Sequence, residues 1–173
     1  MKCNNKALSH RTLAVITSLL FIFVFDIQAQ AQRKQSIQKQ KMEQLSHLVG
    51  EWIGTAKLYE NGEITSEIPA YESIAYDLDS SILVVKLNSE KLQLHTIIYY
   101  DTKDETYYYY PFSKRGVRGI PATLENGNLI VHSSETRRYV FGITPEGGFR
   151  EYGEVLVDGK WVKYFQDDFV NTK

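Results

Sequence analysis

Two hydrophobic patterns follow one another along the chain. From Ser36 to Val49, apolar residues recur close to helical spacing and no proline or glycine intervenes before Gly50, which predicts one short amphipathic helix. Beyond Gly50, β-branched and aromatic residues recur in short runs that are separated by turn residues, a pattern typical of strands. The sequence therefore predicts a helix followed by an almost entirely β domain.

Turn residues interrupt the chain after Gly50 at nine places. These are Asn61-Gly62, Asp79-Ser80, Asn88-Ser89, Asp101–Asp104, Ser113–Gly116, Glu125–Gly127, Ser133–Glu135, Pro145–Gly148 and Asp158-Gly159. Asn-Gly and Asp-Gly between apolar runs favour tight hairpins, because both residues of a type I′ turn need positive φ. Strands joined by such short turns must be antiparallel, and a ten-stranded sheet splits or closes. We expect an all-β, antiparallel, up-and-down barrel of about ten strands, with the short helix capping one end.

Alternation along the strands indicates which side chains face the interior. In residues 51–59 the even positions, from Trp52 to Leu58, are the more apolar, and in residues 91–100 the even face contains Ile98. The run Thr106–Phe112, "TYYYYPF", sends one tyrosine pair inward, either Tyr108 and Tyr110 or Tyr107 and Tyr109. We place Tyr108 and Tyr110 in the interior.

The N-terminus has the order of a secretory signal peptide. Basic residues precede the apolar run of residues 13–25, and Ala29-Gln30-Ala31 forms a small-residue cleavage site. The run is shorter than the roughly 20 residues of a membrane-spanning helix. We expect residues 1–31 to be the signal peptide, residues 32–44 a polar linker and the start of the helix, and residues 45–173 the barrel domain. The mature protein is then secreted or periplasmic, with no membrane span.

Composition and motifs exclude several functions. The single cysteine, Cys3, leaves with the signal peptide, so the domain has no disulfide, which suits a bacterial periplasm or exterior. The formal net charge is −1 and no basic stripe exists for a nucleic acid. The sequence has no nucleophile elbow, no histidine pair at metal-ligand spacing and no phosphate loop, so we assign no catalytic residue and no metal. We interpret Asp167-Asp168 as a solvated strand end.

Three segments resemble a known family. They are "LSHLVGEWIGTAK" at Leu45–Lys57, with its Gly50-x-Trp52-x-Gly54 signature, and the later "IIYYDTKDETYYY" and "EYGEVLVDGKWVKYF". With these segments, residues 45–170 resemble uncharacterised bacterial secreted lipocalin-like domains of the calycin superfamily, neighbours of the nitrobindins and fatty-acid-binding proteins. In such a barrel the tryptophan plugs the closed end, and the glycines let neighbouring backbone approach.

The resemblance implies a small hydrophobic or amphipathic ligand inside the barrel. The cavity residues that we expect are Trp52, Tyr108, Tyr110, Arg137, Tyr139, Tyr152 and Trp161. Nitrobindin-like barrels bind haem through a histidine on a late strand, but His47, His95 and His132 all precede the last strands here. We therefore expect no haem and no other cofactor.

Three alternatives stay open. Arg137 and Arg138 can be surface residues beside a turn rather than interior residues that bind the carboxylate of a ligand. A small barrel enzyme of the isomerase, cyclase or decarboxylase type could use Tyr108 or Tyr110 with Arg137, Glu151 and Tyr152. A filled barrel could instead bind proteins through a tyrosine-rich surface next to Phe112. The chain is expected to be a monomer or a weak homodimer, more a binding protein than an enzyme.

Overall fold

The computed structural model describes residues 28–114 and 116–173. The chain forms two compact units, Met1–Ile37 and Gln38–Lys173, and the strands belong to the second unit. A helix covers residues 28–43 and the short 3-10 helix η1 covers Ser46–Leu48. The strands are β1 (Gly50–Glu60), β2 (Glu63–Asp77), β3 (Ile82–Ser89), β4 (Gln93–Asp101), β5 (Thr106–Phe112), β6 (Ile120–Glu125), β7 (Asn128–Ser134), β8 (Arg137–Ile143), β9 (Phe149–Val157) and β10 (Lys160–Asn171). Most of the expected signal peptide lies outside the described residues, so cleavage after Ala31 stays a prediction.

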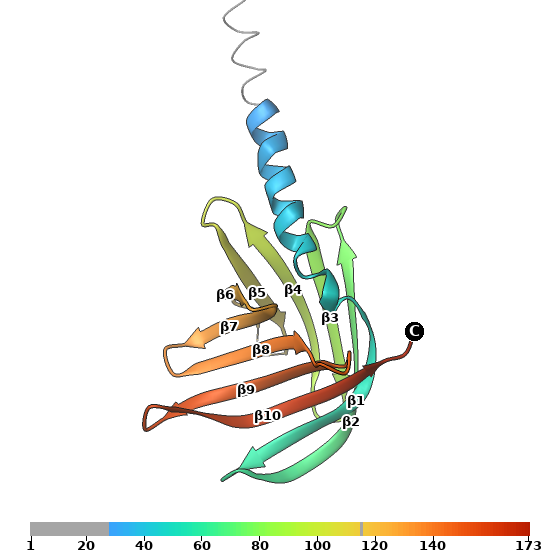
Figure 1. The fold of residues 1–173 in the computed structure, drawn as a ribbon, viewed down its shortest axis with the longest axis vertical. Helices are drawn as coiled ribbons and strands as arrows, with labels where there is room; N and C mark the ends of the chain where they lie inside the picture. The colour runs from blue at the N-terminus through green and yellow to red at the C-terminus, as the bar shows by residue number, and fades with distance from the viewer. Residues whose placement is uncertain (1–27, 115) are drawn as a thin grey trace, which may run out of the picture. The chain divides into compact units, whose positions relative to one another are not determined.

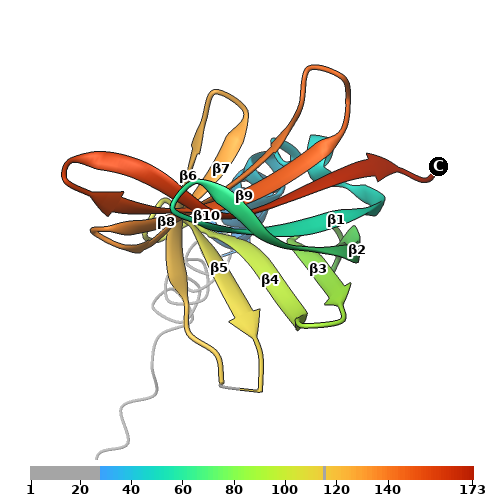
Figure 2. The same ribbon diagram turned by 90° about the horizontal axis from the view of Figure 1, so that it is seen from below.

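The strands form a closed antiparallel barrel in which each strand pairs with its sequence neighbours and β1 also pairs with β10. Figures 1 and 2 show β1 between β2 and β10. Closure depends on Gly54, which lies opposite Ala70 of β2 and Phe169 of β10. A Cβ atom at Gly54 would lie 1.8 Å from the backbone oxygen of Asp168, so no larger residue permits this approach. The prediction of an up-and-down barrel of ten strands is confirmed.

The hairpin turns follow the predicted chemistry. Asn61 and Gly62 have φ values of 52° and 84°, and Asp158 and Gly159 have φ values of 49° and 75°. Both pairs therefore have the two positive φ angles of a type I′ turn, whose twist suits adjacent antiparallel strands. All nine predicted turn regions lie at or next to the boundary between two consecutive strands.

The end of the barrel next to η1, the closed end, is filled by residues that precede β1. Met42, Leu45 and Leu48 are almost fully buried. The helix was expected to run to Val49, but it ends at residue 43, because successive turns bring Leu45 and Leu48 into the core, with their amides donating to the carbonyls of Met42 and Leu45 at 3.0 Å. The Tyr107 hydroxyl fixes this segment by donating to the Lys41 carbonyl at 2.7 Å.

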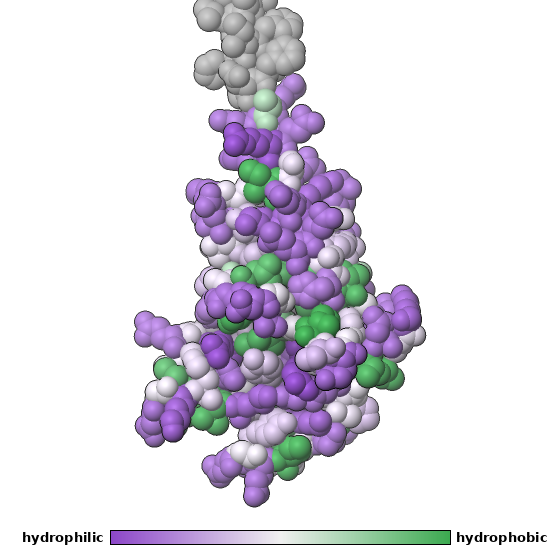
Figure 3. Space-filling model, in the orientation of Figure 1, coloured by the Kyte–Doolittle hydropathy of each residue, from purple (hydrophilic) through white to green (hydrophobic). Residues whose placement is uncertain are grey.

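Aromatic packing completes the closed end. Trp52 is 3% exposed, and its indole nitrogen donates to the Leu48 carbonyl at 3.0 Å. Phe149 is fully buried, with ring centroids 5.5 Å from Trp52 and 5.6 Å from Phe169. The expected plug by the tryptophan of the G-x-W signature is thus confirmed as a packing feature. By contrast, the face of the molecule seen in Figure 3 is mainly hydrophilic, with apolar side chains scattered over it.

Candidate functional site: a cavity with a buried acidic cluster

A cavity of about 630 Å³ occupies the barrel interior. Its walls are mainly aliphatic and aromatic, and the predicted even face of β1 and β4 contributes to them. The apolar lining residues of the strands include Ala56, Leu58, Ile68, Val85, Leu87, Leu94, Ile120, Phe141 and Phe165. Cavities that hold small molecules typically enclose 300 to 1,000 Å³, so this one has the size of a binding site.

The cavity opens at the end of the barrel opposite the closed end. Strand directions place the turns after β1, β3, β5, β7 and β9 at this open end. Exposed lining residues come from these turns and the adjoining strand ends, among them Leu92, Val117 and two cationic residues, Lys91 and Arg118. Lys91 donates to the Ser66 hydroxyl at 2.9 Å, and Arg118 donates to the Ser133 hydroxyl at 3.2 Å. The cavity therefore has a partly basic mouth.

Three carboxyl groups line the deep part of the same cavity. Glu72 on β2, Glu151 on β9 and Asp167 on β10 are 1%, 7% and 5% exposed, and we call them the acidic cluster. Glu151 and Asp167 are directly opposite one another in the β9–β10 pairing and share a hydrogen bond. Glu72 lines the same cavity. Its strand, β2, is separated from β10 only by β1, because β1 pairs with both. Closure of the barrel therefore assembles the cluster.

Burial raises the pKa of every member of the acidic cluster. It raises the pKa of Glu72 to about 8, with a further contribution from the charge of Asp167. It raises the pKa of Asp167 to about 6, and the hydrogen bond with Glu151 opposes this effect. The pKa of Glu151 is raised by burial and then by the neighbouring carboxylates. At neutral pH the cluster thus retains protons that exposed carboxyls would have lost.

Glu72 differs from the other two because the fold gives it no partner. Among residues 28–114 and 116–173, no group forms a hydrogen bond to either of its carboxyl oxygens. An ionised carboxylate buried without a partner is very unfavourable, and even a neutral polar group buried unpaired costs free energy. Such groups in native proteins usually have a specific reason, often a role in binding or catalysis.

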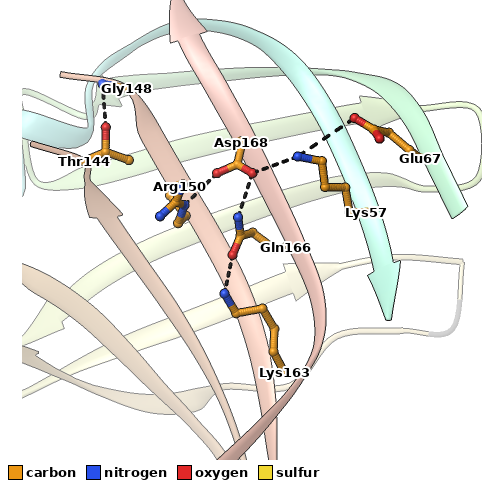
Figure 4. A network of polar contacts seen from close by, with 8 residues as sticks. All are labelled: Lys57, Glu67, Thr144, Gly148, Arg150, Lys163, Gln166 and Asp168. Atoms are coloured by element: carbon orange, nitrogen blue, oxygen red, sulfur yellow. Dashed lines mark hydrogen bonds and ion pairs between the residues drawn. The ribbon is translucent and has the colours of Figure 1, made fainter. Parts of the chain in front are cut away.

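The interpretation of Asp167-Asp168 as a solvated strand end is wrong for Asp167. The two side chains point to opposite faces of β10, so Asp167 enters the cavity while Asp168 stays outside. Asp168 accepts hydrogen bonds from Lys57 at 3.2 Å, Arg150 at 2.6 Å and Gln166 at 2.7 Å (Figure 4). Burial alone would raise the pKa of Asp168, but these hydrogen bonds outweigh it and lower the pKa. The cations of this region therefore neutralise the outer aspartate, not the inner one.

The structure corrects the choice of tyrosine pair. Tyr107 and Tyr109 are the buried pair, at 5% and 6% exposure, whereas Tyr108 and Tyr110 are half-buried outside the cavity. The β4–β5 register decides the phase, because Tyr109 lies opposite the inward Ile98. Tyr109 lines the cavity, and its pKa is raised above all by burial.

Outside the barrel, Tyr108 and Tyr110 pack against each other with ring centroids 6.0 Å apart, and the Tyr108 hydroxyl donates to Asp104. These are the outward tyrosines that the interaction-module alternative requires. Phe112, which that alternative places beside them, is 43% exposed on the same strand. Whether a partner uses them stays a prediction.

The other expected cavity residues divide into one that lines the cavity and four that do not. Tyr139 lines it, whereas Trp52 belongs to the packed closed end. Tyr152 points outward because its neighbours Glu151 and Gly153 face the core, and the Lys163 amine lies 4.7 Å from its ring centroid.

Arg137 and Trp161 lie outside the cavity for different reasons. Arg137 shares the face of Tyr139, but it begins β8 beside a turn and is exposed, as the surface alternative expects. Its guanidinium carbon lies 5.2 Å from the centroid of the Tyr164 ring. Trp161 is 36% exposed and lies under the Arg138 guanidinium, 4.3 Å from the ring centroid. A bulge between Lys163 and Phe165 reverses the phase of β10, so Trp161 faces outward although Phe165 faces inward.

The donor set of the cavity does not fit the haem of nitrobindin-like barrels. None of its lining residues in the described chain is a histidine. His95 and His132 are exposed on the strands, and the His132 ring nitrogen contacts the Thr123 hydroxyl at 2.9 Å. Within the described ranges, no three His, Cys, Asp or Glu side chains are arranged to hold a metal ion. The chemistry of the site therefore resides in its carboxyl and tyrosine hydroxyl groups.

Comparison with protein-family models and with curated protein sequences found no match. The closed ten-stranded antiparallel barrel is consistent with a lipocalin-like fold. No helix among residues 28–114 and 116–173 is both long and apolar enough to cross a membrane.

Proposed function

We propose that this protein binds a small hydrophobic or amphipathic molecule inside its barrel, as a secreted bacterial lipocalin-like carrier. The observation that carries the proposal is the cavity of about 630 Å³, open at one end and walled mainly by aliphatic and aromatic side chains. Transfer of an apolar ligand into such walls yields about 25 cal/mol for each Å² removed from water. The secretory assignment is supported by the basic, apolar and small-residue order of residues 1–31.

Titration of the purified protein with Nile red, a neutral dye that fluoresces in apolar surroundings, tests this proposal. The informative variant is Leu94→Trp, because Leu94 lines the cavity. Its matched control is His95→Trp, since His95 is the next residue of β4 and points outward. We expect the first variant to lose most dye binding and the second to retain it.

Urea unfolding of each variant shows whether it is folded. Should Leu94→Trp fail to fold, Leu92→Trp places the same indole at the more exposed mouth, where Leu92 is 46% exposed. Dye binding that is absent from the wild type, or that both cavity variants leave unchanged, would overturn the proposal.

A further inference from the structure

The acidic cluster points to one chemical class of ligand, and this inference rests on the proposed function. Glu72 is 1% exposed, lines the cavity and has two carboxyl oxygens without a hydrogen-bond partner in the described part of the chain. Structural ion pairs do not explain it, because a structural carboxylate has a partner from the protein. Glu72 itself lines the space that a ligand would enter.

The protein's own cations are placed away from the cluster. Lys57 and Arg150 bind Asp168 on the outer face of β10. Among the described residues that line the cavity, the only lysine and arginine are Lys91 and Arg118, both exposed at the mouth. No cationic side chain of the described chain therefore lines the deep part of the cavity, where the three carboxyls lie.

Glu72 has electrostatic partners that are acidic or neutral groups on three other strands. Glu151 of β9, Asp167 of β10 and Tyr109 of β5 interact electrostatically with it. The ring of Tyr139 also lines the cavity, and aromatic faces attract cations. A positively charged donor would complement all of these groups at once, whereas a carboxylate would be repelled.

We propose that the natural ligand is an amphipathic amine that inserts its protonated nitrogen among Glu72, Glu151 and Asp167 and lays its apolar body along the barrel wall. An ammonium group has only donors, which match acceptor oxygens that the fold leaves free. The basic mouth disfavours insertion with the charged end outward. Lys91 and Arg118 instead suit a ligand whose outer end is neutral or acidic.

Binding of an amine is coupled to proton release from the cluster. With a pKa of about 8 for Glu72 and about 6 for Asp167, part of the cluster is protonated near neutral pH. The ammonium group stabilises the charged carboxylates, so its affinity rises as the pH increases from 6 to 8. A neutral ligand that accepts a hydrogen bond from a protonated carboxyl shows the opposite trend.

Three probes of equal chain length test the proposal, namely decylamine, decanol and decanoate in competition with Nile red. We expect decylamine to bind at least about tenfold more tightly than decanol, as for a charge-assisted hydrogen bond, and decanoate to bind most weakly. The preference for decylamine over decanol increases between pH 6 and pH 8. Glu72→Gln reduces this preference severalfold.

Glu67→Gln is the matched control, because Glu67 is also on β2 but points outward beside Lys57. It makes the same substitution on the same strand and must leave the amine preference intact. Equal binding of decylamine and decanol, a preference that weakens with rising pH, or tightest binding of decanoate would each overturn the amine assignment. Those outcomes still require dye displacement, so they differ from failure of the proposed function, in which Nile red does not bind the cavity.

Discussion

The effect of Glu72→Gln on the free energy of unfolding should change with pH, from neutral or destabilising at low pH to stabilising at high pH. The wild-type carboxyl has its pKa raised from 4.5 to about 8 by burial and by the charge of Asp167. This difference corresponds to about 5 kcal/mol between the protonated and the ionised protein. Glutamine has nearly the same shape but cannot ionise. The free energy of unfolding of the variant therefore lacks the pH dependence that ionisation of Glu72 gives the wild type.

The direction follows from proton binding. Between pH 4.5 and pH 8, Glu72 is protonated in the folded chain and ionised in the unfolded chain. The folded state therefore binds more protons, and its free energy of unfolding falls as the pH rises. The stabilising contribution of the protonated group is fully present below pH 4.5 and is lost as the pH rises through 8.

Urea unfolding monitored by tryptophan fluorescence at pH 5, 7 and 8.5 measures this effect. At pH 5 the variant should equal the wild type or be less stable, because its amide also lacks partners. By pH 8.5 it should be more stable, the difference having changed by at least about 2 kcal/mol, a cautious fraction of the full value. Glu67→Gln, on the outer face of the same strand, should show no such change. A Glu72→Gln difference that stays constant over this range would refute the burial of an unpartnered carboxyl.

Four further substitutions test the barrel by urea unfolding. Gly54→Ala should prevent closure or cost several kcal/mol, because its Cβ would meet the Asp168 oxygen at 1.8 Å; a stable variant would contradict the close β1–β10 approach. Phe149→Ala should cost about 3 to 5 kcal/mol, since Phe149 is fully buried; a loss below about 1 kcal/mol would contradict that packing. Tyr107→Phe should cost about 1 kcal/mol through its lost hydrogen bond to the closed end, and Tyr108→Phe almost nothing; equal losses would argue against the assigned tyrosine phase.

Local sequence chemistry was sufficient to predict the strands and their order. Asn61-Gly62 and Asp158-Gly159 define their hairpins through positive φ, a preference that does not depend on the rest of the fold. Short turns then leave only antiparallel neighbours, and closure follows from strand number. The end of the helix was harder to predict, because it falls at residue 43 through the packing of Leu45 and Leu48 in the barrel.

The phase of the tyrosine run could not be read from the run itself, because four identical residues have no alternation. The register with β4 supplies it, through Ile98 opposite Tyr109. The sequence also predicted an inward Ile98, so counting across the turn at Asp101–Asp104 would have selected the correct pair. The outward direction of Trp161 depends on the bulge after Lys163, and the sequence of that strand does not indicate a bulge.

The acidic cluster did leave a signal in the sequence. Each carboxyl interrupts an apolar face at a spacing of two residues: Glu72 lies between Ala70 and Ile74, and Asp167 lies between Phe165 and Phe169. Glu151 follows Phe149 in the same way. Their assembly could not be inferred from any one strand, because it requires the β1–β10 pairing that closes the barrel.

The placement of charge suggests that the cluster serves binding rather than folding. Asp168 is on the outer face with Lys57 and Arg150, whereas Asp167, one residue earlier, is buried with two other carboxyls. An apolar residue at Glu72 would avoid the burial of an unpaired acid, so stability alone does not account for it. A cationic ligand would remove this penalty when it binds, and would stabilise the folded state in proportion to the logarithm of its concentration. The ligand should therefore raise the stability of the wild type most at the pH values where the empty barrel is weakest.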